Sequence, residues 1–340
     1  MPASGLTPHP GDEIHATVPL LSVVICTYNR AELLRQALES ISRQSLPRRG
    51  YEVIVVDNNS TDHTRSVADS FAREQPNVRY LLEREQGLSR ARNLGWQQAR
   101  GEYVAYMDDD SRAPPEWLET ARGVIERHAP SVFGGNVFPW FDSEKPAWYR
   151  NGYDTHVQQE HAGPLDPAPS KHLPGMNIVF KRSLLQEVGG FSANLGMHGT
   201  RIGYAEETAI VNHVRYGMPG HLVHYEPSFS LEHYVRPEKM RVSWRMASCF
   251  ASGRDSCRMT YLYPSIPPAD RADRGRVGLF VAMAIKSLRL LLSLAHGLTW
   301  RDQTRYPNYR HYWLDRSLTH LFALGILREH YAQKSAGRPG

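Results

Sequence analysis

Short apolar runs alternate with amphipathic stretches through the first third of the chain. Leu20–Ile25, Glu52–Val56, Val78–Leu82 and Tyr103–Met107 are rich in β-branched and aromatic residues, so we predict four buried strands. Short strands that alternate with helices are typical of a parallel, doubly wound α/β sheet. The stretches between them predict amphipathic helices, one with Leu33, Leu34, Ala37, Leu38 and Ile41 on one face and two at Thr61–Arg73 and Leu88–Arg100.

The pattern becomes less regular after Pro130. Strands are predicted at Val132–Phe138 and Gly175–Phe180. The stretch Pro139–His172 between them is aromatic and rich in proline, which favours a loop over a site. Helices are predicted at Arg182–Val188, Glu206–Tyr216 and Pro237–Met259.

Three parts of the chain follow from these patterns. Residues 1–19 predict a flexible tail, without the basic start and apolar core of a signal peptide. Residues 20–260 predict one domain, with a nucleotide-binding half at 20–130 and an acceptor half at 131–260. Residues 261–340 predict a helical region, in which prolines at 264, 267 and 268 break the chain before the final helical part.

Composition narrows the function classes. The 340 residues carry a formal net charge of +5, which suits anionic substrates or membrane surfaces. They contain no block of Lys and Arg, so we expect no nucleic-acid partner. The three cysteines form no CxxC pair, which favours neither a zinc site nor disulfides and indicates a reducing cytoplasm.

Acidic and amide side chains follow three of the predicted strands. Asn29, Asp57 and Asp108–Asp110 all lie where a strand ends. In open parallel sheets ligands bind outside these carboxyl ends, and carboxylates there suit Mg²⁺ or Mn²⁺ beside a phosphate. The simpler alternatives are an acidic surface turn at the triplet and helix capping around Asp57.

Two further stretches fit a nucleotide. The small and polar residues of Thr27-Tyr28-Asn29 allow a base to lie close to the backbone. Gly87–Gly95 opens a helix after a glycine, and Arg92 in its first turns favours an anion. A solvated helix face is the alternative for this arginine.

The chain from about Leu20 to Arg258 resembles a family 2 glycosyltransferase of the GT-A fold. Each matching piece is loose, but their order is specific. The pieces are Val23–Arg30, Val53–Asp62, Gly87–Gly95, Gly101–Asp110, Pro115–Leu118, Gly175–Arg182, Val188–Phe191 and Gly203–Thr208.

The resemblance implies inverting transfer from a nucleotide-sugar to an acceptor hydroxyl, with UDP favoured over dTDP or GDP. It implies Asp110 as a ligand of Mn²⁺ or Mg²⁺, and His233 either as a second ligand or as a structural histidine. The acceptor is a glycan, a lipid-linked sugar or a small molecule. The nucleotide contacts it implies are Thr27, Tyr28, Asn29, Asp57, Arg92, Asp108 and Asp109, although the role of Asp109 is left open.

The same resemblance assigns the catalytic base to an acidic helix start. By alignment the base is Glu207, where the family more often has Asp, and Glu206 is the second choice. The alternative is an acidic pair that only complements the helix dipole. Acceptor contacts are expected from Gly175, Met176 and Asn177, and from Trp140 if it stacks on a sugar; Trp140, Trp148 and Tyr149 fit a core equally well.

Two other classes compete with glycosyl transfer. A sugar nucleotidyltransferase uses a similar acidic site, and a nucleotide-sugar-binding protein needs no base. The pair Glu206-Glu207 and the acceptor-side stretch favour glycosyl transfer over the first class. The intact triplet Asp108–Asp110 and Glu207 speak against the second. A processive synthase is disfavoured because the chain has no Gln-x-x-Arg-Trp element; Trp244-Arg245 has the reverse order.

An apolar stretch at 277–298 predicts a helix with Lys286, Arg289, Ser293 and His296 on one face. The charges near its middle argue against a membrane span. Three alternatives remain for this helix: lying in a membrane interface on the inner face of the cytoplasmic membrane, packing on the domain, or forming a homodimer contact.

Overall fold

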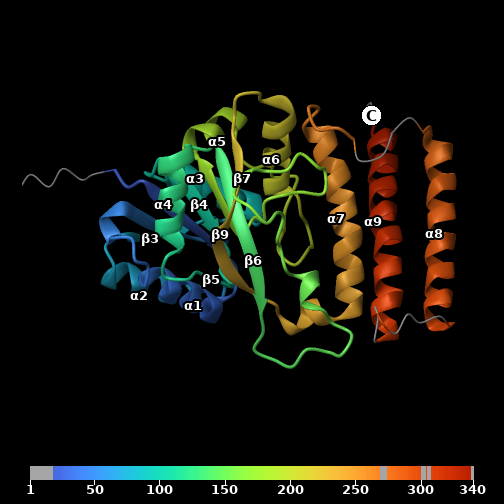
Figure 1. Ribbon diagram of the computed structural model, residues 1–340, viewed down its shortest axis with the longest axis horizontal. Coiled ribbons are helices and arrows are strands. Elements are labelled where there is room, and N and C mark those ends of the chain that lie inside the picture. The colour runs from blue at the N-terminus through green and yellow to red at the C-terminus, as the bar shows by residue number, and fades with distance from the viewer. Residues whose placement is uncertain (1–17, 269–273, 300–303, 305–307, 338–340) are drawn as a thin grey trace, which may run out of the picture.

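The computed structural model describes residues 18–268, 274–299, 304 and 308–337. A twisted sheet with helices on both faces forms the main body, and three long helices stand side by side at one edge (Figure 1). This is an α/β fold of the GT-A type with a C-terminal helical extension, as predicted. The predicted N-terminal tail lies almost wholly outside the described residues.

The first half of the sheet is parallel. Strand β1 (Leu21–Thr27) pairs with β2 (Tyr51–Asp57) and β4 (Tyr103–Met107), and β2 pairs with β3 (Val78–Leu82). All four strands were predicted from their apolar runs, and parallel pairing brings their carboxyl ends to one edge. The helices between them are α1 (Ala31–Ser42), α2 (Thr64–Glu74) and α3 (Leu88–Gln98), with the short turn η1 (Arg48–Gly50) before β2.

Both antiparallel and parallel pairs extend the sheet beyond β4. β8 (Asn177–Lys181) runs against both β4 and β6 (Val132–Trp140), and β9 (Val223–Tyr234) lies next to β6. The sequence did not predict β9, because Pro227 and Ser228 interrupt its pattern. They lie where the register with β6 shifts between Gly135 and Val137, so the ladder continues on both sides of this bulge.

Short elements complete the domain. β5 (Ser111–Arg112) and β7 (Gly163–Pro164) both pair antiparallel with β9.

The predicted helix Pro237–Met259 was wrong in detail. The stretch from Pro237 is a 3₁₀ turn, η3 (Pro237–Met240), followed by a separate helix. The remaining elements are α4 (Trp117–His128), η2 (Asn151–Tyr153), α5 (Arg182–Val188), α6 (Glu206–Gly217), α7 (Val242–Leu262), α8 (Arg276–Thr299) and α9 (Tyr309–Ser335).

Each face of the sheet has its own apolar core. Side chains from α1, α2 and α4 pack on one face, and side chains from α3, α5 and α6 pack on the other. Gly95 explains why α3 lies so close to β1, because a Cβ there would stand 2.4 Å from Val24 Cγ1. Trp148 and Tyr149 are buried in a third cluster with Val235, so they have the core role that the sequence left open.

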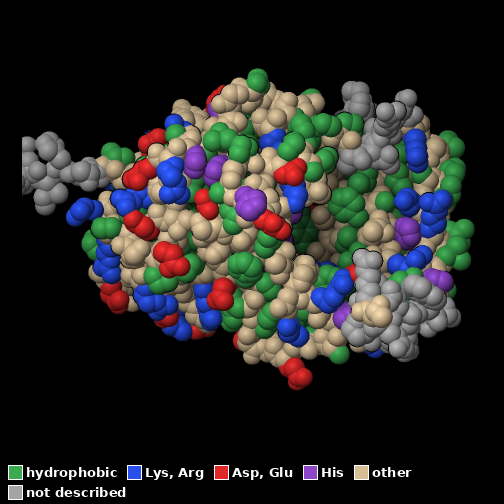
Figure 2. All heavy atoms as spheres, in the orientation of Figure 1, with side chains coloured by type: hydrophobic (Ala, Val, Ile, Leu, Met, Phe, Trp, Pro, Cys, Tyr) green, Lys and Arg blue, Asp and Glu red, His purple; other side chains and the backbone are tan. Residues whose placement is uncertain are grey.

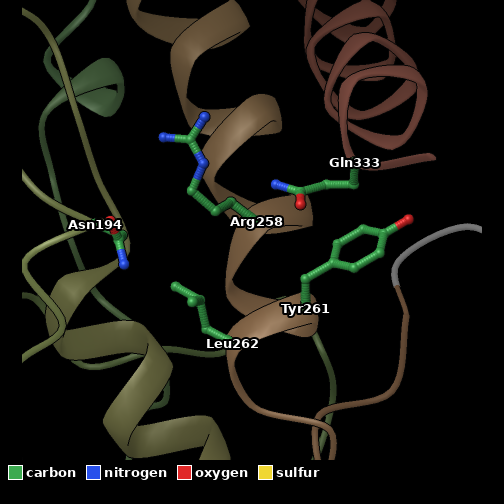
Figure 3. Close-up of a pocket in the computed structure, with 5 residues that line it drawn as sticks. All are labelled: Asn194, Arg258, Tyr261, Leu262 and Gln333. Carbon is green, nitrogen blue, oxygen red and sulfur yellow. The ribbon is translucent and has the colours of Figure 1, made fainter. Parts of the chain in front are cut away.

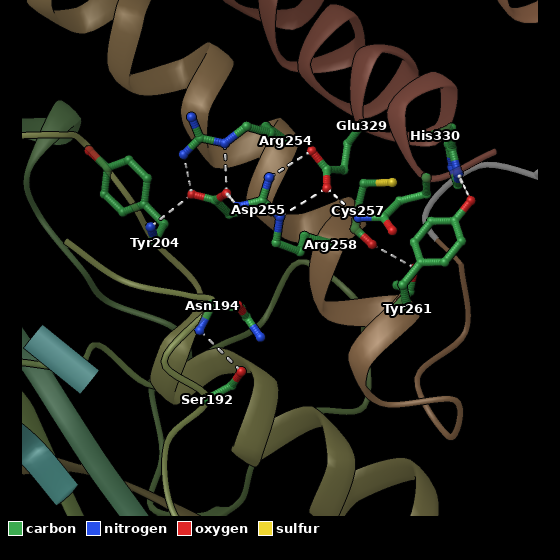
Figure 4. A network of polar contacts seen from close by, with 12 residues as sticks. Ser192, Asn194, Tyr204, Arg254, Asp255, Cys257, Arg258, Tyr261, Glu329 and His330 are labelled. Carbon is green, nitrogen blue, oxygen red and sulfur yellow. Dashed lines mark hydrogen bonds and ion pairs between the residues drawn. The ribbon is translucent and has the colours of Figure 1, made fainter. Parts of the chain in front are cut away.

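The helix α9 lies between α7 and α8 (Figure 1). Arg258 of α7 forms two hydrogen bonds of 2.9 Å to Glu329 of α9, and Asp255 accepts one from the backbone of Tyr204 (Figure 4). Asp255 thereby fixes the segment just before α6. The hollow beside Arg258, lined by Asn194, Tyr261, Leu262 and Gln333 (Figure 3), contains none of the predicted site residues.

Candidate active site

The ends of β1 and β2 are joined by side chains that the sequence singled out. Thr27 and Asp57 are register partners. Asn29 adopts a left-handed φ of 53°, accepts a hydrogen bond from the backbone of Thr61 at 2.7 Å and donates its own N–H to Ser60. Thr27 is buried and Tyr28 half-buried beside it. The predicted base-binding stretch is therefore a fixed loop.

Asp57 is buried and already has two partners. It accepts hydrogen bonds from the backbone of Ser60 at 2.8 Å and from the hydroxyl of Tyr80 at 3.0 Å. Burial, together with this carboxylate, raises the pKa of Tyr80 to about 12. Asp57 thus stabilises the turn after β2, while Asp62 bonds the first backbone N–H of α2. A nucleotide contact would use the remaining lone pairs of Asp57.

Three predicted residues converge after β4. One ligand atom each from Asp108, Asp110 and His233 lies within 4.8 Å of the others. The antiparallel pairing of β5 with β9 is the cause, because it sets Ser111 opposite His233 and bonds Tyr234 N to the carbonyl of Asp110 at 2.8 Å. The sheet therefore joins residues separated by more than a hundred positions.

The donor set of this cluster fits a divalent cation. Asp110 Oδ1 is buried, lies 3.1 Å from His233 Nε2, and has no aligned hydrogen-bond partner among the described residues. Burial opposes ionisation of Asp110, but the charges of His233 and Lys239 outweigh it and hold its pKa well below the usual range. Buried carboxylate oxygens beside an imidazole nitrogen suit Mn²⁺ or Mg²⁺.

Arg30 explains the middle member of the triplet. Its guanidinium donates to Asp109 at 2.7 Å and to Asp110 at 3.3 Å. Asp109 is buried, and burial raises its pKa while Arg30 opposes that shift. Asp109 was expected among the nucleotide contacts, but its carboxylate faces Arg30 instead, so we now assign it to holding that arginine.

Arg92 lies among carboxylates and differs from the expectation of an anion-binding helix start. Its side chain is only 3% exposed, and its nitrogens lie 2.9 Å from Glu206, 3.6 Å from Glu207 and 3.6 Å from Asp108. The charge of Arg92 is therefore shared between the end of β4 and the start of α6. This arginine links the two predicted functional sites of the chain.

The two acidic residues at the start of α6 differ in environment. The Glu206 side chain is 6% exposed and that of Glu207 15%. Burial raises the pKa of Glu206 to about 8; Glu207 adds to this shift and Arg92 opposes it. Glu207 is thus the more exposed member of the pair, while Glu206 is enclosed against Arg92.

Comparison with known proteins decides the family. Residues 22–189 match Glycosyl transferase family 2. Glucosyl-dolichyl phosphate glucuronosyltransferase of Haloferax volcanii is 30% identical over 257 residues, which cover 72% of this chain and 78% of that protein. This chain belongs to glycosyltransferase family 2.

A second relative is also a glycosyltransferase, and a solved structure has a similar fold. The GalNAc(5)-diNAcBac-PP-undecaprenol beta-1,3-glucosyltransferase of Campylobacter jejuni is 35% identical over 119 residues, covering 34% of this chain and 38% of its own. The mannosyltransferase PcManGT of Pyrobaculum calidifontis, solved with GDP-Man and Mn²⁺, superposes with a TM-score of 0.61 at 22% identity. It covers 93% of this chain and 88% of its own, and it shares the fold.

The predicted acceptor residues of the glycosyltransferase differ in their surroundings. Gly175 lies against the acidic pair, since Arg92 donates to its carbonyl at 3.3 Å. Asn177 is fully buried and bonds to Trp117, Asn136 and Phe229, so its side chain has a structural role and is not free to contact an acceptor. Met176 packs half-buried against the core, and Trp140 stacks on Tyr234 at 4.5 Å, beside the cation Arg112.

Gly175 gives the glycosyltransferase a testable close contact. A Cβ at this position would stand 2.9 Å from Glu207 Cδ and 3.1 Å from an Arg92 nitrogen. We expect Gly175→Ala to displace Glu207 and to lower turnover about 100-fold, because a misplaced catalytic group costs that much. Steady-state kinetics checks this, with Gly152→Ala, where a Cβ meets nothing within 4 Å, as the matched control. Equal turnover of both variants would show that Glu207 needs no such placement.

The sequence missed three cations at this site. Arg30, Arg236 and Lys239 all act on the charge of Asp110 or Asp109. Burial lowers the pKa of both Arg236 and Lys239. A signal was present, because Arg30 directly follows Asn29 and the other two follow His233 within six positions.

Proposed function

We propose that this glycosyltransferase moves a sugar, with inversion, from a nucleoside-diphosphate sugar to an acceptor hydroxyl with the help of a divalent metal. The observation that carries the proposal is that Arg92 links a cluster of metal-ligand side chains to the acidic start of α6. Asp108, Asp110 and His233 form a cation cluster, and Arg92 joins it to Glu207. A site that holds the donor diphosphate thus lies next to a carboxylate that accepts a proton.

The residues have distinct tasks in the proposed reaction. The acceptor oxygen forms a bond to the anomeric carbon while the bond from that carbon to the diphosphate oxygen breaks. Glu207 takes the proton from the acceptor hydroxyl, and the diphosphate leaves with the electron pair. Arg92 keeps Glu207 in place with its buried charge. A cation held by Asp108, Asp110 and His233 would neutralise the charge on the leaving diphosphate.

The positive side chains missed by the sequence support the donor site. Arg30, Arg236 and Lys239 surround the cation cluster, and Arg236 Nε is buried without a hydrogen-bond partner among the described residues. Guanidinium groups bind phosphate oxygens well. We propose that these three side chains contact the diphosphate and that the loop Thr27–Asn29 and Asp57 contact the nucleoside.

The names of two relatives support a lipid-linked acceptor. One acts on a glucosyl-dolichyl phosphate and the other is named for a diNAcBac-PP-undecaprenol. We propose an acceptor of this class, used at the cytoplasmic face of a membrane. UDP is the nucleotide of the donor that we favour. GDP is the alternative, and the neighbour solved with GDP-Man supports it.

A thermal-shift panel tests the donor site. UDP, GDP and dTDP are added with Mn²⁺ or with EDTA, and uridine and guanosine serve as controls without phosphate. At about 100 times its dissociation constant, the correct diphosphate should raise the melting temperature by about 5 °C with Mn²⁺. The shift should vanish in EDTA. Shifts of equal size in EDTA would contradict the metal site, and no shift with any diphosphate would contradict the donor site.

A further inference from the structure

The helix α8 exposes one continuous apolar face. Its outward side chains include Phe280, Leu288 and Leu291, and the large apolar residues of this face are between 47% and 78% exposed. They recur three and four positions apart, so they lie on one side of the helix. The set is Val277, Phe280, Val281, Ile285, Leu288, Leu291 and Leu292.

The opposite side of α8 is occupied by α9. Leu279 and Ala282 are buried there against Leu327, and Ser293 is buried further along. The helix therefore has a partner on one side only. A contiguous exposed apolar surface of this kind marks a docking site in soluble proteins.

Basic residues lie beside and behind the apolar face. By helical spacing Arg289 stands at its margin, and Lys286 stands on the side of the buried Ala282 and Ser293. Lys286 and Arg289 of α8 lie near Arg316 and His320 of α9, and burial together with these positive charges lowers the pKa of His320. No carboxylate pairs with Lys286, Arg289 or Arg316 within the part of the chain that the structure describes. Figure 2 shows hydrophobic and basic side chains next to each other along the edge formed by α8.

We propose that the apolar face of α8 docks on the surface of an anionic lipid bilayer, with α8 lying in the interface. Its 24 residues give a surface about 36 Å long. The apolar side chains enter the boundary of the acyl chains, Arg289 at the margin of that face reaches the lipid phosphates, and Lys286 adds positive charge behind it. This inference would bring the proposed lipid-linked acceptor to the enzyme, but it stands on the surface of α8 alone.

The positive charges of α8 and α9 favour a lipid surface over two alternatives, which are a second copy of this chain and a membrane-spanning position of α8. A second copy of α8 offers no carboxylate to these cations, because Arg276–Thr299 contains no Asp or Glu. By length and composition the helix could also cross a membrane. A crossing in the observed packing would carry Lys286, Arg289 and the neighbouring Arg316 into hydrocarbon, which is costly.

Vesicle flotation of the full chain tests the proposal without any substrate. Vesicles of phosphatidylcholine alone and of phosphatidylcholine with phosphatidylglycerol are compared at low salt. Wild-type protein should float, and more strongly with phosphatidylglycerol. The double variant Leu288→Glu with Leu291→Glu should lose at least about ten-fold in binding, because both carboxylates would enter the apolar layer. Val157→Glu, at an exposed apolar residue outside α8, should bind like wild type.

A second variant isolates the charge contribution. Lys286→Gln with Arg289→Gln should lose about ten-fold in binding to the phosphatidylglycerol vesicles and little to the neutral ones. Failure of the wild type to float would overturn the proposal. Protein that stays in the membrane after alkaline extraction would also overturn it, because that indicates a spanning helix. A dimer of the wild type that the Leu288 and Leu291 variant disrupts would overturn it as well. The diphosphate thermal shift should persist in all variants, so the two proposals fail separately.

Discussion

Glu207→Gln is expected to lower turnover by about 10²–10⁴-fold, the usual contribution of a general base. Gln has nearly the same shape but cannot accept the proton of the acceptor hydroxyl at neutral pH. Donor affinity should be unchanged, because the cation cluster of Asp108, Asp110 and His233 is intact. Single-turnover kinetics, with calorimetry of donor binding, measures both quantities.

Two comparisons make this result specific. Glu126→Gln, at an exposed glutamate on α4, should leave turnover at the wild-type level. Glu206→Gln should keep more activity than Glu207→Gln, since Glu206 is enclosed against Arg92. If Glu207→Gln turns over like wild type while Glu206→Gln does not, the base is Glu206.

Asp110→Ala is expected to remove the metal dependence of nucleotide binding. The substitution deletes the buried oxygen that has no hydrogen-bond donor and leaves His233 without its charged neighbour. The affinity for the nucleoside diphosphate in Mn²⁺ should fall by about 100-fold or more, to the value measured in EDTA. Calorimetric titration with and without Mn²⁺ checks this.

The controls for Asp110→Ala separate binding from folding. Asp69→Ala, at an exposed carboxylate on α2, should bind the nucleotide like wild type. Asp110→Asn keeps the size of the side chain and should lose the same metal dependence with less loss of stability. Unchanged affinity of Asp110→Ala in Mn²⁺ would remove Asp110 from the metal site.

The parallel half of the fold was predictable because local pattern and tertiary role agree there. β3 and β4 match the predicted bounds, and the other strands of this half differ by one or two residues at their ends. The long strand β9 was not predictable from its own residues. Its ladder depends on β6, β5 and β7, which lie far away in the sequence, and Pro227 hides the pattern.

Some residues of the candidate site could likewise be predicted from local sequence, and others could not. Asp108 and Asp110 could be found from the strand that ends before them, and His233 only from the family resemblance, because the pairing of β5 with β9 brings it there. The roles of Arg30 and Arg92 required the structure. The sequence favoured an anion contact for Arg92, with a solvated helix face as the alternative. Only the three-dimensional arrangement shows that carboxylates enclose it.

The stereochemistry of transfer tests the central proposal most directly. With a sugar donor built on the nucleoside diphosphate that the thermal-shift panel identifies, proton NMR of the first product gives the configuration at the anomeric carbon. In-line attack by an acceptor hydroxyl that Glu207 deprotonates requires the opposite configuration to that of the donor. An inverted product is the expected result. A product that retains the donor's configuration would contradict single displacement and with it the role proposed for Glu207.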